Sequence, residues 1–77
     1  MIMDAKSIGS VLRQIRLRKG LSQEVLSGLA QLDRTHYSKI ERGLRTPTLE
    51  TIFKIANAID TKPHLIVKEI EEGMERQ

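Results

Sequence analysis

The stretch LSQEVLSGLAQLDRTHYSKIERG, residues 21–43, decides the fold of this chain. Its pattern predicts two short helices, over about residues 23–30 and 34–42, separated by a tight corner. Ser22 and Asp33 are suited to begin these helices, because their side-chain oxygens can accept a hydrogen bond from a free backbone N–H of the first turn. Apolar residues then recur at helical spacing, which gives each helix one face to bury.

The second of these helices has a polar and cationic side opposite its buried face. Tyr37 and Ile40 point inwards on a helical wheel. The opposite side carries hydrogen-bond donors and positive charge, supplied by Thr35, Ser38, Lys39 and Arg42, with Arg34 on the flank. Such a surface suits the major groove of DNA, where base edges present acceptors between two lines of phosphates. The alternative is a helix face that is merely solvated.

Residues spaced in register along the chain carry a family pattern. They are Leu21-Ser22-Gln23-Glu24, Leu26, Ala30, Leu32, Arg34-Thr35, Tyr37-Ser38, Ile40-Glu41-Arg42-Gly43, Arg45, Pro47-Thr48-Leu49 and Lys54-Ile55-Ala56. With them the chain resembles, over roughly residues 8–66, the helix-turn-helix of the lambdoid phage repressor and Cro family, which includes restriction–modification controller proteins. The resemblance implies an all-α fold that binds double-stranded DNA.

Two positions depart from the family pattern. Gln31 stands at the corner where Gly is common, so a residue with a Cβ atom is expected to adopt the left-handed backbone conformation at some strain. Ser27 stands where Ala is common, and it still permits close approach of the helices. Neither departure changes the assignment.

We expect the second helix of the pair to contact base edges through Arg34, Thr35 and Lys39. Arginine is the side chain best shaped to donate two parallel hydrogen bonds to guanine O6 and N7. Contacts to the DNA backbone are expected from Ser22, Gln23, His36, Ser38, Arg42 and Arg45. The role of Gln23 is implied by the resemblance, and for His36 a solvated or internally bonded ring is the alternative.

The resemblance also implies a structural ion pair. In phage repressors an Arg of the first helix pairs with a Glu near the end of the recognition helix, and Arg16 and Glu41 stand at the matching positions. We expect this pair to be partly buried and to fix the angle of the recognition helix, so that loss of one partner would leave a buried unpaired charge.

Three further helices are predicted around this pair. Apolar spacing places the first over about residues 7–19, after a start without periodicity, and Thr48 and Pro63 are suited to begin the other two. Leu65 and Ile66 are expected to close the core. On the helix after Thr48, the expected core positions are Leu49, Ile52, Phe53, Ala56 and Ile59, with Ile55 off that stripe.

The sequence thus predicts one all-α domain, a compact five-helix bundle of the lambda repressor-like type. Its core is expected over about residues 7–67, followed by a C-terminal helix or tail over 68–77 that Gly73 weakens by about 1 kcal/mol. A dimer contact is expected at Ile55, Ile66, Ile70 and Met74. For Ile66, completion of the monomer core is the alternative, and for Ile55 the alternative is packing under the first helix.

Composition narrows the class of protein. The 77 residues contain no Cys and carry a net charge of +3, with nine Lys or Arg against four Asp or Glu in residues 1–45. Such an excess of positive charge in one part of the chain is expected where that part of a protein meets a polyanion. With no signal segment and no stretch long enough to cross a bilayer, a cytoplasmic protein is expected. Neither a metal nor a cofactor site, nor a site for a small-molecule ligand, is evident.

The leading hypothesis is a sequence-specific transcriptional regulator, a repressor or an activator, that binds a palindromic operator as a homodimer. The alternative is an antitoxin-type interaction module for which DNA binding is secondary. An enzyme is rejected, because the chain has no phosphate loop, no nucleophile–base constellation and no organised carboxylate pair.

Overall fold

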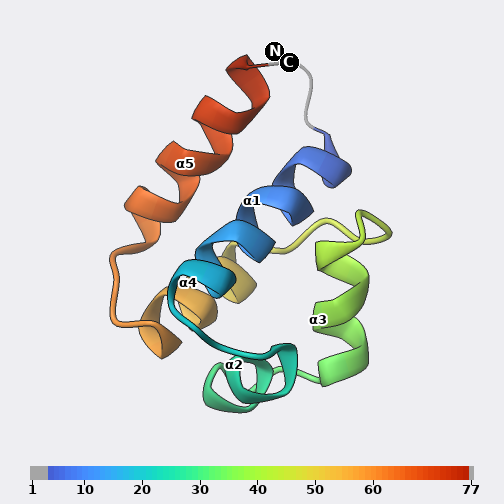
Figure 1. Cartoon of the computed structure of the whole chain (residues 1–77), viewed down its shortest axis with the longest axis vertical. Helices are drawn as coiled ribbons and strands as arrows, with labels where there is room; N and C mark the ends of the chain where they lie inside the picture. The colour runs from blue at the N-terminus through green and yellow to red at the C-terminus, as the bar shows by residue number, and fades with distance from the viewer. Residues whose placement is uncertain (1–3, 77) are drawn as a thin grey trace.

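The computed structural model describes residues 4–76, which contain five α-helices and no strand (Figure 1). The helices are α1 (Ala5–Arg18), α2 (Gln23–Leu29), α3 (Arg34–Glu41), α4 (Leu49–Ala58) and α5 (Pro63–Glu75). Helix α1 packs against α3 and α5, while α2 packs against α3 and α4, and α4 against α5. The predicted all-α, five-helix architecture is confirmed. Residues 1–3, part of the non-periodic start, and Gln77 lie outside the described residues.

The predicted helix starts are confirmed at four positions. Ser22, Asp33 and Thr48 each accept a hydrogen bond from the backbone N–H three residues further on, and Pro63 is the first residue of α5. Helix α1 begins earlier than expected, because the Asp4 side chain accepts from the backbone N–H of Lys6 and from the Ser7 hydroxyl. Local capping chemistry therefore sets four of the five helix starts in the described residues.

The core lies where the buried faces of all five helices meet. Tyr37 and Ile40 are inward as predicted, and both are fully buried. Around them pack aliphatic residues from the other four helices and the end of α4, namely Ile8, Val11, Leu12, Ile15, Leu26, Ile52, Ile55, Ala56, Ile59, Ile66 and Ile70.

Helix α4 is turned relative to the sequence prediction. Leu49 and Phe53, expected in the core, are 68% and 55% exposed, whereas Ile55 is 1% exposed. Two overlapping stripes on this helix fit the 3.6-residue period, and packing against α2 and α5 selects the one that contains Ile52 and Ile55. Leu65 is also exposed instead of closing the core.

Three of the four residues expected at a dimer contact belong to the monomer core. Ile55 and Ile66 are 1% exposed and Ile70 is 7% exposed within a single chain. They pack against other helices of the same chain, so they offer almost no surface to a partner. Met74 is partly buried and packs against the same core.

Two glycines allow close approach to α1, and the sequence reasoning gave neither of them this role. A Cβ atom on Gly9 would collide with the backbone carbonyls of Ile40 and Glu41 in α3, and one on Gly73 would lie 2.7 Å from Cγ2 of Val11. Gly73 was expected to weaken the last helix, but α5 continues through it to Glu75, because packing against α1 stabilises this turn.

The corner between α2 and α3 adopts the predicted strained conformation. Gln31 has a φ of 57°, in the left-handed region, and its backbone N–H donates to the carbonyl of Gly28. Asp60, between α4 and α5, takes the same conformation with a φ of 56°, which the sequence reasoning did not foresee.

The contact at Gly9 gives a prediction. Gly9→Ala should lower the free energy of unfolding by about 1–3 kcal/mol, because the added methyl group forces α1 away from α3. Gly28→Ala is the matched control, since a Cβ atom there meets nothing within 4 Å. It should leave stability unchanged or raise it by up to about 1 kcal/mol. Urea unfolding of both variants measures the difference, and equal midpoints would contradict the packing account.

Candidate nucleic-acid interface

Helix α3 is held from behind and exposed in front. Its buried residues are Tyr37, Ile40 and Glu41. Arg34 and Thr35, in its first turn, are exposed, so both lie on the surface as the helical wheel predicts. Lys39 is half-buried, which leaves only part of its side chain at the surface.

The residues expected to meet the DNA backbone are spread over three segments. His36 and Arg42 are exposed on α3 and at its end, Ser38 is half-buried, and Arg45 is exposed in the loop that follows. Within residues 4–76, the side chains of Arg34, Lys39, Arg42 and Arg45 form no hydrogen bond or ion pair. Four cations are therefore gathered on α3 and its following loop without neutralising partners in this part of the chain.

At the start of α2, the two residues that were expected to contact the DNA backbone have different surroundings. The Ser22 hydroxyl is exposed and serves as the helix cap, accepting from the backbone N–H of Val25 at 3.1 Å. Gln23 is half-buried, and its Nε2 donates to Oε1 of Glu41 at 2.9 Å. The sequence offered no signal for this second contact, since the two residues are 18 positions apart.

The structure brings Arg16 and Glu41 together in a buried, two-point contact. Nε of Arg16 lies 2.7 Å from Oε2 of Glu41, and Nη2 lies 3.0 Å from Oε1. The side chains are 9% and 2% exposed, so the pair is more deeply buried than expected. Nη1 of Arg16 also donates to the carbonyl of Leu21 at 2.8 Å, which ties the loop before α2 to the same guanidinium.

The buried carboxyl of Glu41 is kept ionised by its donors. Burial raises its pKa, but hydrogen bonds from Arg16, Tyr37 and Gln23 outweigh that effect, and the net pKa is lowered. Burial, followed by the hydrogen bond to Glu41, raises the pKa of Tyr37, so its hydroxyl remains a proton donor. A charged acceptor with neutral and cationic donors is the stable state of this cluster.

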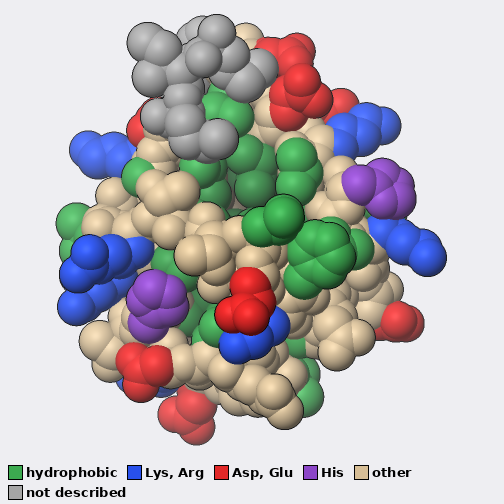
Figure 2. All heavy atoms as spheres, turned by 180° about the vertical axis from the view of Figure 1, so that it is seen from behind, with side chains coloured by type: hydrophobic (Ala, Val, Ile, Leu, Met, Phe, Trp, Pro, Cys, Tyr) green, Lys and Arg blue, Asp and Glu red, His purple; other side chains and the backbone are tan. Residues whose placement is uncertain are grey.

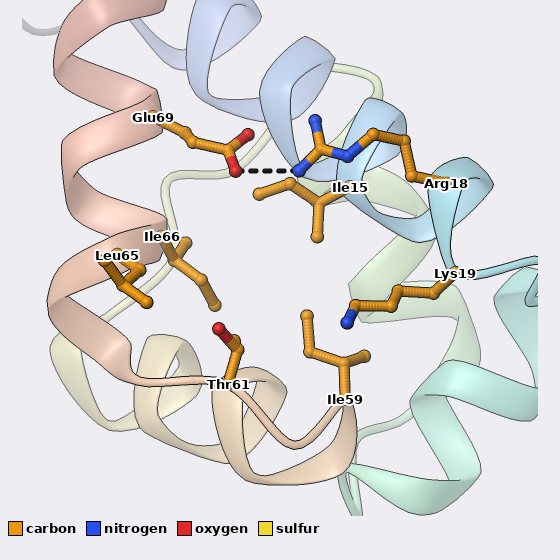
Figure 3. A pocket seen from close by; sticks show the side chains of 8 residues that line it. All are labelled: Ile15, Arg18, Lys19, Ile59, Thr61, Leu65, Ile66 and Glu69. Atoms are coloured by element: carbon orange, nitrogen blue, oxygen red, sulfur yellow. Dashed lines mark hydrogen bonds and ion pairs between the residues drawn. The ribbon is translucent and has the colours of Figure 1, made fainter.

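A hollow between α1, α5 and the end of α4 lies away from the expected DNA residues. It measures about 260 Å³ and is lined by Ile15, Arg18, Lys19, Ile59, Thr61, Leu65, Ile66 and Glu69. Figure 3 shows Lys19 and Thr61 turned toward it and the ion pair of Arg18 with Glu69, whose atoms are 2.7 Å apart, at its edge. This pair joins α1 to α5. None of the lining residues comes from α3.

Across residues 4–76, no group of three or more His, Cys, Asp or Glu side chains is arranged to hold a metal ion. None of the helices in this range has the length and apolar character needed to cross a membrane.

The ion pair gives a prediction for stability and its pH dependence. Glu41→Gln should lower the free energy of unfolding by about 3–5 kcal/mol at neutral pH, because it leaves the Arg16 guanidinium buried without its anion. The pKa of Glu41 is lowered by folding, so its contribution is present above pH 4.5, the ordinary value, and is lost as pH falls through the folded pKa. Unfolding measured from pH 3 to pH 7 should therefore show a weaker pH dependence in the variant.

A matched control tests whether burial is responsible. Glu69→Gln removes the exposed ion pair with Arg18 and should cost less than about 1 kcal/mol. Similar losses in the two variants, or parallel stability curves for Glu41→Gln and wild type, would contradict the structural role of Glu41.

Comparisons with known proteins agree with this geometry. The helix-turn-helix family pattern matches residues 12–66. The control protein C.BamHI of Bacillus amyloliquefaciens is 46% identical over 56 residues, which cover 71% of this chain and 69% of that protein. The crystal structure of the restriction-modification controller protein C.AhdI from Aeromonas hydrophila is 42% identical, covers 80% of this chain and 94% of its own, and gives a TM-score of 0.76.

A second controller protein has been solved as an assembly. C.Esp1396I, as a tetramer in complex with its natural 35 base-pair operator, is 29% identical, with a TM-score of 0.80 over 90% of this chain and 91% of its own. With a family pattern over most of its length and relatives of this similarity, the chain belongs to the helix-turn-helix family.

Proposed function

We propose that this protein is a sequence-specific transcriptional regulator that binds double-stranded DNA with α3 in the major groove. The observation that carries the proposal is the contrast between the two sides of α3. Its rear is fixed by fully buried Tyr37 and Ile40, while Arg34 and Thr35 are exposed and the Arg34 side chain forms no hydrogen bond or ion pair within residues 4–76. The operator complex of C.Esp1396I supports the proposal from a relative.

The residues divide into those that read bases and those that hold the backbone. Arg34 and Thr35 contact base edges from the first turn of α3, and Lys39 contacts a base or a phosphate one turn later. Arg42 and Arg45 neutralise phosphates on one side of the groove. Ser22, His36 and Ser38 make the remaining contacts to the DNA backbone. The amide of Gln23, first expected at a phosphate, donates to Glu41 instead.

Substitution of Arg34 and Arg45 separates these roles. Selection of bound duplexes from a random pool first gives the preferred sequence. Arg34→Ala should then reduce discrimination at one position of each half-site about 10- to 100-fold, because a bidentate contact to guanine is lost. Arg45→Ala should weaken binding to all duplexes alike and reduce the slope of log affinity against log salt by about one unit. Affinities measured at several salt concentrations test both. A random pool that yields no consensus would overturn the proposal.

We also propose that the regulator acts as a homodimer on a palindrome, with half-sites about 34 Å apart. The candidate surface combines exposed Leu49 and Phe53 of α4 with exposed Val67 of α5. Leu49 and Val67 belong to the lining of an apolar groove of about 190 Å³, which is formed by Ile8, Thr46, Pro47, Leu49, Ile52, Val67 and Ile70. Figure 2, which views the molecule from behind relative to Figure 1, shows hydrophobic side chains near the middle of that side. Exposed apolar surface of this kind is typical of protein interfaces.

This surface takes the place of the buried residues that were first expected at the dimer contact. We propose that it binds a second copy of the chain. The support is the tetramer that C.Esp1396I forms on its operator. Met74, at the end of α5, remains a candidate for the edge of the interface.

Phe53→Glu tests the dimer surface without disturbing the core, because the ring is 55% exposed. A buried, unpaired carboxylate at the interface should raise the dimer dissociation constant by at least about 10-fold. Leu17→Glu, at a similarly exposed residue of α1, is the control and should leave dimerisation unchanged. Light scattering from micromolar to millimolar protein, with and without DNA, measures the mass. A wild-type protein that stays monomeric throughout would contradict the dimer.

A further inference from the structure

Resting on the proposed function, we propose that the Tyr37 hydroxyl and the Gln23 amide are positioning groups that set the sequence specificity of α3 by fixing the carboxylate of Glu41. Neither group needs to touch a base for this role. Each acts through Glu41, which lies in the last turn of the recognition helix.

The carboxylate of Glu41 is saturated by donors. Oε2 accepts from Nε of Arg16 and from the Tyr37 hydroxyl, and Oε1 accepts from Nη2 of Arg16 and from Nε2 of Gln23. An ionised carboxylate has about four lone-pair sites, so these four hydrogen bonds leave it no alternative partner. The orientation of Glu41 is therefore determined from all sides.

The donors come from three different helices. Arg16 belongs to α1, Gln23 begins α2, and Tyr37 lies one turn before Glu41 on α3. The Tyr37 side chain is fully buried in the core, so its hydroxyl is a fixed reference for the position of Glu41. Through this one carboxylate, the C-terminal half of α3 is held at a set angle to both α1 and α2.

Specific and non-specific binding depend differently on that angle. Hydrogen bonds to base edges require positioning within about 0.5 Å and 10–20°. Attraction between cations and phosphates tolerates larger displacements, because it arises from charge and counterion release. A small rotation of α3 should therefore weaken binding to the preferred duplex and spare binding to other sequences.

The Gln23 amide has one defined orientation in this arrangement. A carboxylate only accepts, so Nε2 and not Oε1 must face Glu41. The family resemblance assigns Gln23 a contact to phosphate. Loss of a phosphate contact alone would weaken binding to every duplex by the same factor. A fall in specificity would instead identify the positioning role.

The experiment compares Tyr37→Phe and Gln23→Met with wild type on two duplexes. One is the palindrome selected from a random pool, and the other has the same length and composition in scrambled order. Each variant should lower the ratio of the two affinities about five- to tenfold, the scale of one hydrogen bond, while affinity for the scrambled duplex and its salt slope stay within twofold. Thermal unfolding and circular dichroism first establish that every variant is folded at the assay temperature.

Two further variants sharpen the result. Arg45→Ala, the matched control, should weaken binding to both duplexes equally. Glu41→Gln combined with Tyr37→Phe should lower the ratio little more than Glu41→Gln alone, because both changes act through the same carboxylate. If the double variant lowered the affinity ratio by the product of the two single reductions, the two residues would act independently and the shared mechanism would be overturned.

The remaining outcomes are separable. An unchanged affinity ratio in folded Tyr37→Phe overturns the role of its hydroxyl, and equal losses on both duplexes in Gln23→Met make that residue a phosphate contact only. In both cases the proposed function still holds if the wild-type protein binds the selected palindrome more tightly than the scrambled duplex. If wild type does not distinguish the two duplexes, the proposed function fails and this inference fails with it.

Discussion

The buried carboxylate of Glu41 is the interaction on which the arrangement of the helix-turn-helix depends. Two short helices of seven and eight residues bury little surface by themselves, so their mutual angle needs a further constraint. Arg16 supplies it by binding both oxygens of Glu41 and the carbonyl of Leu21. The first helix thereby holds the loop before α2 and the recognition helix with a single guanidinium, and the geometry suits its planar, multi-donor shape.

Packing and electrostatics support the same placement of α3. Gly9 lets the backbone of α1 lie against the carbonyls of Ile40 and Glu41, where any side chain would collide. The ion pair then forms across the same contact between α1 and α3. Because the rear of the helix is fixed both by close packing and by charge-assisted hydrogen bonds, its cationic front can remain unpaired without loosening the fold.

The sequence was sufficient wherever the determinant is local. Caps at Ser22, Asp33 and Thr48 and the buried face of α3 follow from residue chemistry at short range. The strained corner at Gln31 was expected from the family resemblance, because Gly is common at that position. Resemblance supplied the pairing of Arg16 with Glu41. Features that depend on distances between helices were missed. Neither the spacing rule nor composition distinguishes Phe53 from Ile55 as the core residue of α4, because each lies on a stripe with helical period.

Dependence on distances between helices also explains why buried residues were expected at the dimer contact. From the sequence, Ile66, Ile70 and Met74 could equally form a dimer contact or complete the monomer core. Only the position of α1, which packs against α5, distinguishes the two. The hydrogen bond between Gln23 and Glu41 was not predicted for a similar reason. Polar side chains 18 positions apart give no periodic signal, and their meeting depends on how the corner turns.

The contact between α1 and α5 has a consequence during synthesis of the protein. Gly73 lies against Val11, so the opening helix is completed by the closing one, more than sixty residues later. A growing chain that has not yet released α5 from the ribosome leaves part of the apolar side of α1 uncovered. Cooperative folding, and with it a fixed recognition helix, must then wait for the turns of α5 around Gly73 to emerge.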